Sequence, residues 1–433
     1  MNKRTITSFA LFFASFGIVI AGETGPRSAT VPMALDHKRM TVEVEVHKSD
    51  GTWKKVSAWV DTGSTAVIMA EALARDLGID LSGMPPGGEH SFATTTPVPS
   101  LSLGGIPLDT EAMKLSVHPG RFARPGVQAE CVLPPRCLRR LHVVFDYPAR
   151  KMTVAGLRAL TPRGAAVPCR VNPDTGLFMI EATIDGEKVA LGVDTGSAGT
   201  WVSDKLTAAW LARHPEWPHA VGAAGSTNFF GFPFETKGVL LCLPAFAVGS
   251  VQVERETAVL GLDQGLFDWY SQKSAAPVAG FLGAEALARF RLEVDFPGQM
   301  TWWLPGPPRP APTGPPRPAP TGPFRPAPTG PFRPAPTGPP PAPRDLDMVG
   351  LCLRPEADGS YFVAGVVSRD GRTLVPGVAP GDRLLKVGGL EVTGASMGRV
   401  VGALRGKPGD VRLLHLERQG KPLTVRATVM RLP

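Results

Sequence analysis

The chain of 433 residues contains only five cysteines, which lie at positions 131, 137, 169, 242 and 352. They are too few and too scattered for a disulfide scaffold or for a metal site built from paired Cys-x-x-Cys motifs. An oxidising compartment would allow bridges between Cys131 and Cys137 and between Cys169 and Cys242, leaving Cys352 unpaired. Buried free thiols are an equally good alternative, because free cysteine behaves as a small hydrophobic residue.

Several catalytic motifs are missing as well. The sequence has no His-Glu-x-x-His, no Gly-x-Ser-x-Gly and no phosphate-binding loop, which argues against a zinc peptidase, a serine hydrolase of the α/β type and a nucleotide hydrolase. His214 and His219 could contact a metal, but a proline-rich loop makes solvated histidines the simpler interpretation. We therefore expect neither a metal nor a cofactor.

Long hydrophobic runs are also absent. Lys3 and Arg4, the apolar stretch 9–20 and the small pair Ala21-Gly22 are typical of a secretory signal peptide over residues 1–22. An uncleaved N-terminal anchor is the alternative. No later stretch approaches the roughly 20 apolar residues that a transmembrane helix needs. We expect an exported protein, periplasmic or secreted, whose mature chain has no transmembrane segment.

The net charge of +8 does not belong to the folded part of the chain. Setting aside Lys3, Arg4 and the five arginines at 309, 317, 325, 333 and 344 leaves 39 basic and 38 acidic residues. A nearly neutral surface argues against a nucleic-acid partner.

A proline-rich segment, residues 305–344, divides the chain. From Gly306 an eight-residue unit recurs, beginning as Gly-Pro-Pro-Arg-Pro-Ala-Pro-Thr. Such a density of proline favours an extended polyproline II conformation, which at about 3.1 Å per residue spans on the order of 100 Å. We interpret the segment as a spacer between a large N-terminal block and a small domain over 345–433; recognition through its Pro-x-x-Pro pattern is the alternative.

The N-terminal block repeats itself. Alternating apolar residues, an Asp-Gly turn and a second strand pattern precede Val-Asp-Thr-Gly-Ser at 60–64, and the same order precedes 193–197. Both halves end on a short helix, a strand and a turn, at 138–148 and 287–297. The second half is about 16 residues longer between motif and end, an interval that contains His214 to His219. We predict two copies of one mainly β unit, over 30–165 and 166–304.

The two Asp-Thr-Gly-Ser motifs suit hydrolysis by a pair of carboxylates. Two carboxyl groups that share one proton can both activate a water molecule and protonate a leaving group, because like charges at close range cannot both ionise. Each aspartate ends an apolar strand pattern and precedes a glycine, which allows close approach of the two loops. A third copy, Asp174-Thr175-Gly176, follows Asn-Pro and predicts a plain turn. We predict Asp61 and Asp194 as the catalytic pair, supported by the rest of the two motifs, Thr62, Gly63, Ser64, Thr195, Gly196 and Ser197.

Residues 30–304 resemble two fused retropepsin-like units of the aspartic protease family, the small β domain that pepsin-like enzymes carry as two lobes. The resemblance rests on the two motifs and on Phe281-Leu282-Gly283, an apolar-apolar-Gly strand that supports the catalytic loop in this family. It implies a mainly β, bilobal, pseudo-twofold fold in which Asp61 and Asp194 activate water. The first half departs from the pattern with Val132-Leu133-Pro134, which puts the support under Asp61 in question.

Two further features bear on this resemblance. The three tyrosines, at 147, 270 and 361, are poorly placed to serve as the flap tyrosine of pepsin-like enzymes, which favours the retroviral type. Flap candidates are the segments 92–96 and 222–226.

The C-terminal domain resembles an α+β PDZ domain of the bacterial periplasmic protease type, through Ala-Pro-Gly-Asp-Arg-Leu-Leu-Lys-Val at 379–387 and Gly-Asp-Val-Arg-Leu at 409–413. Such a domain binds an extended peptide tail between a sheet edge and a helix. The resemblance implies that Gly350 and Leu351 hold the terminal carboxylate, while Val400, Val401 and Leu404 line the groove. For the helix residues a plain core role is equally good.

Together these features predict an exported aspartic endopeptidase with protein or peptide substrates and C-terminal peptide tails as ligands of the PDZ domain. The short connection between the halves favours a monomer with an intramolecular pair of aspartates. The alternative is a binding or scaffolding protein that has lost hydrolysis, which Pro134 would support.

Overall fold

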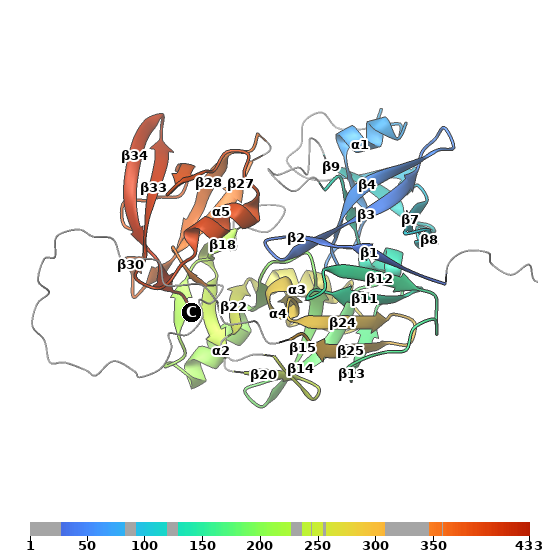
Figure 1. The fold of residues 1–433 in the computed structure, drawn as a ribbon. Coiled ribbons are helices and arrows are strands. Elements are labelled where there is room, and N and C mark those ends of the chain that lie inside the picture. The colour runs from blue at the N-terminus through green and yellow to red at the C-terminus, as the bar shows by residue number, and fades with distance from the viewer. Residues whose placement is uncertain are drawn as a thin grey trace, which may run out of the picture.

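The computed structural model describes residues 27–82, 92–118, 129–226, 236–243, 245–253, 257–307, 346–356 and 358–433. The fold is mainly β and has three parts: a first unit up to residue 155, a second unit from 165 to 305 and a C-terminal module from 346 onward (Figure 1). The expected signal peptide lies outside the described residues, as does nearly all of the proline-rich segment.

The first unit is built on a long hairpin. In its first strand Val42, Val44 and Val46 are buried while the residues between them are more exposed, as an alternating strand pattern requires. The elements of this unit are β1 (Ser28–Pro32), β2 (Ala34–Asp36), β3 (Arg39–His47), β4 (Trp53–Val60), β5 (Ile68–Ala70), α1 (Glu71–Asp76), β6 (Phe92–Pro97), β7 (Leu101–Leu103), β8 (Ile106–Pro107), β9 (Lys114–His118), β10 (Cys131–Leu133), the 3-10 helix η1 (Pro135–Leu138), β11 (His142–Asp146) and β12 (Lys151–Ala155).

The second unit repeats this order. Its opening hairpin turns at Asp185 and Gly186, whose positive φ angles of 51° and 77° suit a two-residue β-turn of the type that joins twisted strands. Its elements are β13 (Ala165–Val171), β14 (Phe178–Ile184), β15 (Glu187–Asp194), β16 (Thr200–Ser203), α2 (Asp204–Arg213), β17 (His219–Val221), β18 (Gly225–Ser226), β19 (Val239–Leu243), β20 (Phe246–Val248), β21 (Val251–Val253), β22 (Thr257–Leu262), α3 (Gln264–Ser271), β23 (Gly280–Gly283), α4 (Ala284–Leu287), β24 (Phe290–Asp295) and β25 (Met300–Pro305).

The two units meet in a six-stranded sheet with strand order β1-β12-β11-β24-β25-β13. Each unit contributes its first strand and its last two strands, and β11 pairs with β24 in antiparallel fashion at the centre. The equivalence of the two halves about this central pair gives the predicted bilobal, pseudo-twofold architecture.

The predicted extra length of the second unit lies chiefly between α2 and β19. Strands β17 and β18 fall in this interval and have no counterpart among the described residues of the first unit. The loop from His214 to His219 precedes them, with the His214 ring stacked on Trp217 at a centroid distance of 4.4 Å. This insertion faces the C-terminal module.

The C-terminal module is α+β, with one helix lying against a small sheet. Its main sheet has the order β27-β28-β31-β33-β34, and α5 buries Met397, Val400, Val401 and Leu404. Its elements are β26 (Asp347–Met348), β27 (Leu351–Pro355), β28 (Tyr361–Val366), β29 (Ser368–Arg369), β30 (Arg372–Thr373), β31 (Arg383–Val387), β32 (Leu390–Glu391), α5 (Met397–Leu404), β33 (Val411–Arg418), β34 (Lys421–Thr428) and β35 (Met430–Arg431).

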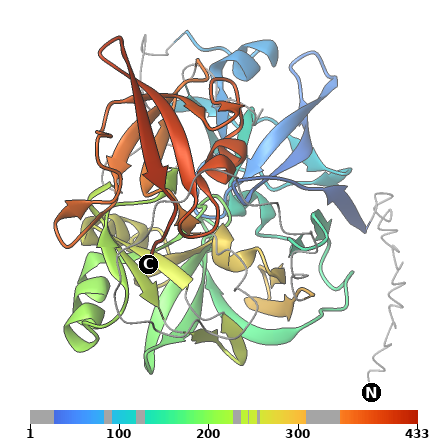
Figure 2. The same ribbon diagram turned by 60° about the vertical axis from the view of Figure 1, so that its left-hand side comes forward.

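The module packs against both units (Figures 1 and 2). Strand β18 of the second unit pairs in parallel with β27, and β17 pairs with β29 at Val221 and Ser368. From the first unit, Asp36 at the tip of the β2–β3 hairpin accepts a 2.8 Å hydrogen bond from the N–H of Gly398 in the first turn of α5.

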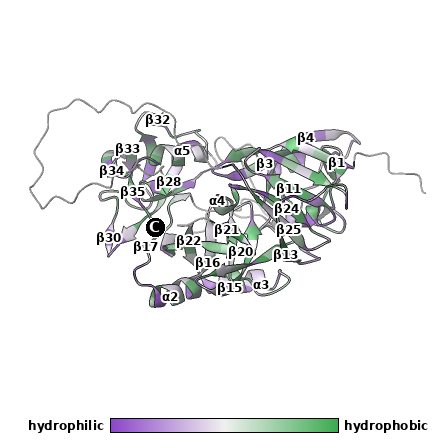
Figure 3. Cartoon of the chain, turned by 60° about the horizontal axis from the view of Figure 1, so that its bottom comes forward, coloured by the Kyte–Doolittle hydropathy of each residue, from purple (hydrophilic) through white to green (hydrophobic). Residues whose placement is uncertain are grey.

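The hydrophobic core follows this arrangement. One cluster of buried side chains runs through both units, and a second joins residues of the second unit, such as Leu240, Leu260 and Phe281, to the core of the module. Figure 3 shows hydrophobic and hydrophilic residues alternating along many of the strands. The shared second cluster makes the module a packed part of the molecule.

The structure decides between the alternatives for the cysteines. All five cysteines are free and buried, so neither Cys131–Cys137 nor Cys169–Cys242 is bridged. In the part of the chain that the structure describes, no helix is long and apolar enough to cross a membrane.

Candidate active site

The two aspartates of the repeated motifs stand at equivalent places, each at the end of a strand in a parallel pair. Strand β4 leads to Asp61 beside β10, where Val60 is opposite Leu133, and the Asp61 N–H donates to the Leu133 carbonyl at 3.0 Å. Strand β15 ends on Asp194 beside β23, where Asp194 is opposite Gly283. Parallel pairing deep in each unit therefore fixes where both carboxyl groups emerge.

The threonines of the two motifs join the loops by reciprocal hydrogen bonds. Thr62 Oγ1 donates to the Val193 carbonyl at 2.6 Å and accepts from the Thr195 N–H at 3.0 Å. Thr195 Oγ1 donates to the Val60 carbonyl at 2.7 Å and accepts from the Thr62 N–H at 3.2 Å. Both threonines are fully buried. Each loop thus holds the strand end of the opposite unit.

The glycines let the carboxyl groups approach across the pseudo-twofold axis. A Cβ added to Gly63 would lie 2.6 Å from Asp194 Oδ2, and one added to Gly196 would lie 2.4 Å from Asp61 Oδ1. Each glycine N–H also donates to the aspartate of its own motif, at 3.0 Å for Asp61 and 2.8 Å for Asp194. Any larger residue would displace a carboxyl group.

Both carboxyl groups bind protons more tightly than an exposed aspartate. Burial, followed by the charge of Asp194 and a hydrogen bond with it, raises the pKa of Asp61 well above its usual range. Burial also raises the pKa of Asp194, against the opposing effect of hydrogen bonds from Gly196, Asp61 and Ser197. The pair can therefore hold one proton between its two carboxyl groups. Asp194 accepts two backbone N–H groups and Asp61 accepts one, which favours the negative charge on Asp194.

The serines brace the two loops differently. Ser64 Oγ donates to the Ala66 carbonyl at 3.1 Å, and Ser197 Oγ donates to the Gly199 carbonyl at 2.7 Å. In addition the Ser197 N–H donates to Asp194 Oδ1 at 3.1 Å, a contact that favours the ionised form of that carboxyl group.

The departure at Pro134 leaves the strand support in place but removes donors. Strand β10 still pairs with β4, as β23 pairs with β15. After Gly283 the N–H groups of Ala284 and Glu285 donate to the carbonyls of Ser197 and Ala198, at 2.8 and 3.0 Å. By the strand register Pro134 and Pro135 are equivalent to Gly283 and Ala284. They have no N–H to donate, so the first unit lacks counterparts of the Ala284 bond and of the 3.2 Å bond from the Gly283 N–H to Thr200 Oγ1.

No family model matches the chain, and no curated protein matches it. Among solved structures, the crystal structure of an aspartic proteinase from Irpex lacteus aligns with 64% of this chain and 97% of that chain, at 13% sequence identity and a TM-score of 0.37.

One residue near the pair was missed from the sequence. Arg39 is the first residue of β3 and is almost fully buried. Its guanidinium carbon lies 5.4 Å from the centre of the Trp59 ring, and its charge lowers the pKa of both Asp61 and Asp194. An arginine at the start of an amphipathic strand gives no sign that it will point at a site. Tyr270 was predicted to be poorly placed to serve as a flap tyrosine. Burial raises its pKa, and the charges of both aspartates raise it further.

The remaining predicted residues are placed as follows. Asp174 is exposed in a turn closed by Asn172, whose Oδ1 accepts from the N–H groups of Asp174 and Thr175. Within the described residues no cluster of histidine, cysteine or acidic side chains could hold a metal.

The residues predicted to bind peptide tails lie together around β27 and α5. Leu351, Val400 and Leu404 are fully buried, the Leu351 N–H donates to the Val349 carbonyl at 2.7 Å, and the Gly350 carbonyl accepts from Val367. The β27 edge carries β18, which also contacts α5. In this arrangement the sheet edge holds a strand of the same chain.

The threonine contacts lead to a stability prediction. Thr62→Val and Thr195→Val each leave a buried carbonyl and a buried N–H without their partner, which should lower the free energy of unfolding by about 2 kcal/mol or more. Thr62→Ser and Thr195→Ser keep the hydroxyl and should lose much less. Urea unfolding measures both. Equal losses in the valine and serine variants would show that the hydroxyl bonds contribute nothing.

The raised pKa values lead to a pH prediction. Because the folded protein holds protons that the unfolded chain releases near pH 3.8, stability falls as the pH rises through the folded pKa values of Asp61 and Asp194. Each pH unit crossed costs up to about 1.4 kcal/mol per carboxyl group. Asp61→Asn removes that group's proton, so its stability relative to wild type should increase from pH 3 to pH 7. Thermal unfolding of both proteins across this range is the measurement; a constant difference would contradict the assignment.

Proposed function

We propose that this protein is an aspartic endopeptidase that hydrolyses peptide bonds with Asp61 and Asp194. The observation that carries the proposal is the approach of two carboxyl groups, Asp194 buried and Asp61 partly exposed, across a pseudo-twofold axis, close enough that each abuts the other unit's glycine. Their raised pKa values support a pair that shares a proton over part of the acidic to neutral range.

The chemistry follows from the unequal pair. Ionised Asp194 takes a proton from a water molecule as the water oxygen bonds to the peptide carbonyl carbon, while protonated Asp61 gives its proton to the carbonyl oxygen. The tetrahedral product then collapses: its C–N bond breaks, the leaving nitrogen receives the proton held by Asp194, and a hydroxyl proton returns to Asp61. Each turnover restores the starting state without a covalent intermediate.

The proposal extends to the surroundings of the site. The N-terminal sequence supports export to the periplasm or beyond, with residues 1–22 removed. The motifs at 379–387 and 409–413 support a PDZ domain that recognises apolar peptide tails, although a tail would have to displace β18 from the β27 edge. Pairing of β11 with β24 within one chain supports a monomer. The rival proposal, a binding protein without hydrolysis, rests on the amide donors that Pro134 and Pro135 lack.

Incubation of the purified protein with an unfolded protein mixture, from acidic to neutral pH, tests the proposal. Mass spectrometry should find new internal termini that accumulate with time, with a rate that declines as the pH rises above the pKa of the proton-sharing pair. Intact substrate at every pH would overturn the peptidase and leave the binding protein.

A further inference from the structure

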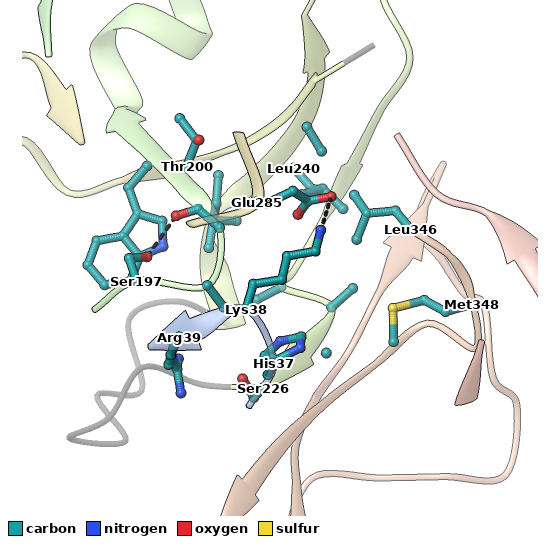
Figure 4. Close-up of a pocket in the computed structure, with 18 of the residues that line it drawn as sticks. His37, Lys38, Arg39, Ser197, Thr200, Ser226, Leu240, Glu285, Leu346 and Met348 are labelled. Atoms are coloured by element: carbon teal, nitrogen blue, oxygen red, sulfur yellow. Dashed lines mark hydrogen bonds and ion pairs between the residues drawn. The ribbon is translucent and has the colours of Figure 1, made fainter. Parts of the chain in front are cut away.

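A cavity of about 70 Å³ opens where the three parts of the molecule meet (Figure 4). The first unit lines it with residues 37–39 of the β2–β3 hairpin, and the second unit with residues 197–201 and 223–226. The C-terminal module adds Leu346, Met348 and Arg405. The cavity therefore has no complete wall without the module.

The cavity is next to the catalytic pair. Ser197, in its lining, donates its N–H to Asp194, and Arg39, also in its lining, lowers the pKa of both aspartates. Thr200 Oγ1, also on the wall, accepts from the N–H of Gly283, the residue opposite Asp194. A peptide chain lying over the two carboxyl groups would pass this opening.

The lining offers apolar surface for an aliphatic side chain beside the charged groups of Lys38, Arg39, Glu285 and Arg405. Leu240, Leu260, Ala258, Leu346 and Met348 supply apolar surface. The small residues Gly199, Ala223, Ala224 and Gly225 leave the space open. Figure 4 shows Leu346 and Met348 on the side facing Thr200. Lys38 lies between Thr200 and these two residues and reaches Glu285, with its Nζ 3.5 Å from the carboxylate. The volume is several times what one water molecule needs, so a side chain can enter.

The module also fixes two walls that it does not itself form. Gly225 and Ser226 pair with Cys352 and Leu353 of β27, so the wall segment 223–226 continues into the module's sheet. On the other side, the hydrogen bond from the Gly398 N–H to Asp36 holds the hairpin that carries residues 37–39. The module thus sets the shape of the cavity as well as part of its surface.

We propose that this cavity is a substrate subsite for an aliphatic side chain, and that Leu346 of the C-terminal module determines which side chain it accepts. The inference rests on the proposed peptidase function. It gives the module a direct part in substrate selection beside the catalytic pair.

The test compares the full-length protein with its Leu346→Ala and Leu346→Phe variants on a peptide library read by mass spectrometry. At one position near the cut, wild type should prefer valine or leucine. Leu346→Ala should move the ratio of kcat/KM toward phenylalanine by about tenfold, and Leu346→Phe should move it toward alanine. Leu423→Ala is the matched control: the same truncation on β34 of the module, outside the cavity lining, should leave the profile unchanged.

A second measurement separates failure of the subsite from failure of the peptidase. Calorimetry measures how tightly the same proteins bind peptides that cannot be cleaved, because a hydroxyethylene group replaces the scissile amide. The peptides carry valine or phenylalanine at the selected position. Selective binding that depends on residue 346 without cleavage would keep the subsite and overturn the peptidase. Cleavage with one unchanged profile in all variants would overturn the subsite, and absence of both cleavage and binding would overturn both.

Discussion

Replacing either Asp61 or Asp194 by asparagine should reduce peptide cleavage by about a thousandfold or more. In the proposed mechanism the two carboxyl groups act as one unit, because one must be ionised to accept the water proton while the other donates to the carbonyl oxygen. An amide can do neither, and positioned acid–base groups typically contribute 10²–10⁴-fold to rate. The double variant should therefore be scarcely worse than either single one, which initial rates on a fluorogenic peptide would measure.

The third Asp-Thr-Gly sequence provides the matched control. Asp174→Asn makes the same chemical change in the same tripeptide, but its carboxyl group is exposed in a turn. Its activity should equal that of wild type. Residual activity of more than a tenth in Asp61→Asn or Asp194→Asn, with correctly folded protein, would show that the reaction does not use the pair.

Much of this site could be predicted because its signals are local and repeated. An aspartate at the end of an apolar strand, followed by Thr-Gly-Ser, occurs twice in the same order of elements. The strand, the serine and the repetition together separate Asp61 and Asp194 from Asp174, which follows Asn-Pro and precedes Thr-Gly-Leu. The alternation around Val42, Val44 and Val46 likewise predicts the hairpin that precedes the first motif. The local sequence pattern was sufficient to predict a residue's place where that place depends on the residue's own strand.

What could not be predicted depends on contacts between distant segments. Nothing in the sequence of residues 219–226 indicates that they join the sheet of a module beginning after residue 346, because a two-residue pairing such as β18 with β27 leaves no periodic pattern. Arg39 is a similar case, since a charged residue in an amphipathic strand is normally solvated. The insertion was visible as extra length, but its contact with the module required the tertiary structure.

The strands that support the two aspartates differ at the position opposite the carboxyl group: one has room for a side chain and the other does not. A substitution at the crowded position should therefore have a large effect on stability. Gly283 lies against the turn that follows the second motif, and a Cβ at this position would be 1.9 Å from the backbone oxygen of Gly199. Its φ of −89° is open to any residue, so the restriction is one of space alone. Pro134, in the equivalent place of the first unit, shows that the same restriction does not apply there.

Gly283→Ala should therefore lower the free energy of unfolding by about 3 kcal/mol or more, since backbone must move to admit the methyl group. The shift would separate β23 from the turn that holds Ser197, so activity should fall as well. Gly199→Ala is the control for stability, because a Cβ there meets nothing within 4 Å and should be neutral or slightly stabilising. Urea unfolding of the two variants decides the matter: equal midpoints would mean that the turn yields freely, and that the fit of Gly283 beneath Asp194 does not hold the catalytic loop.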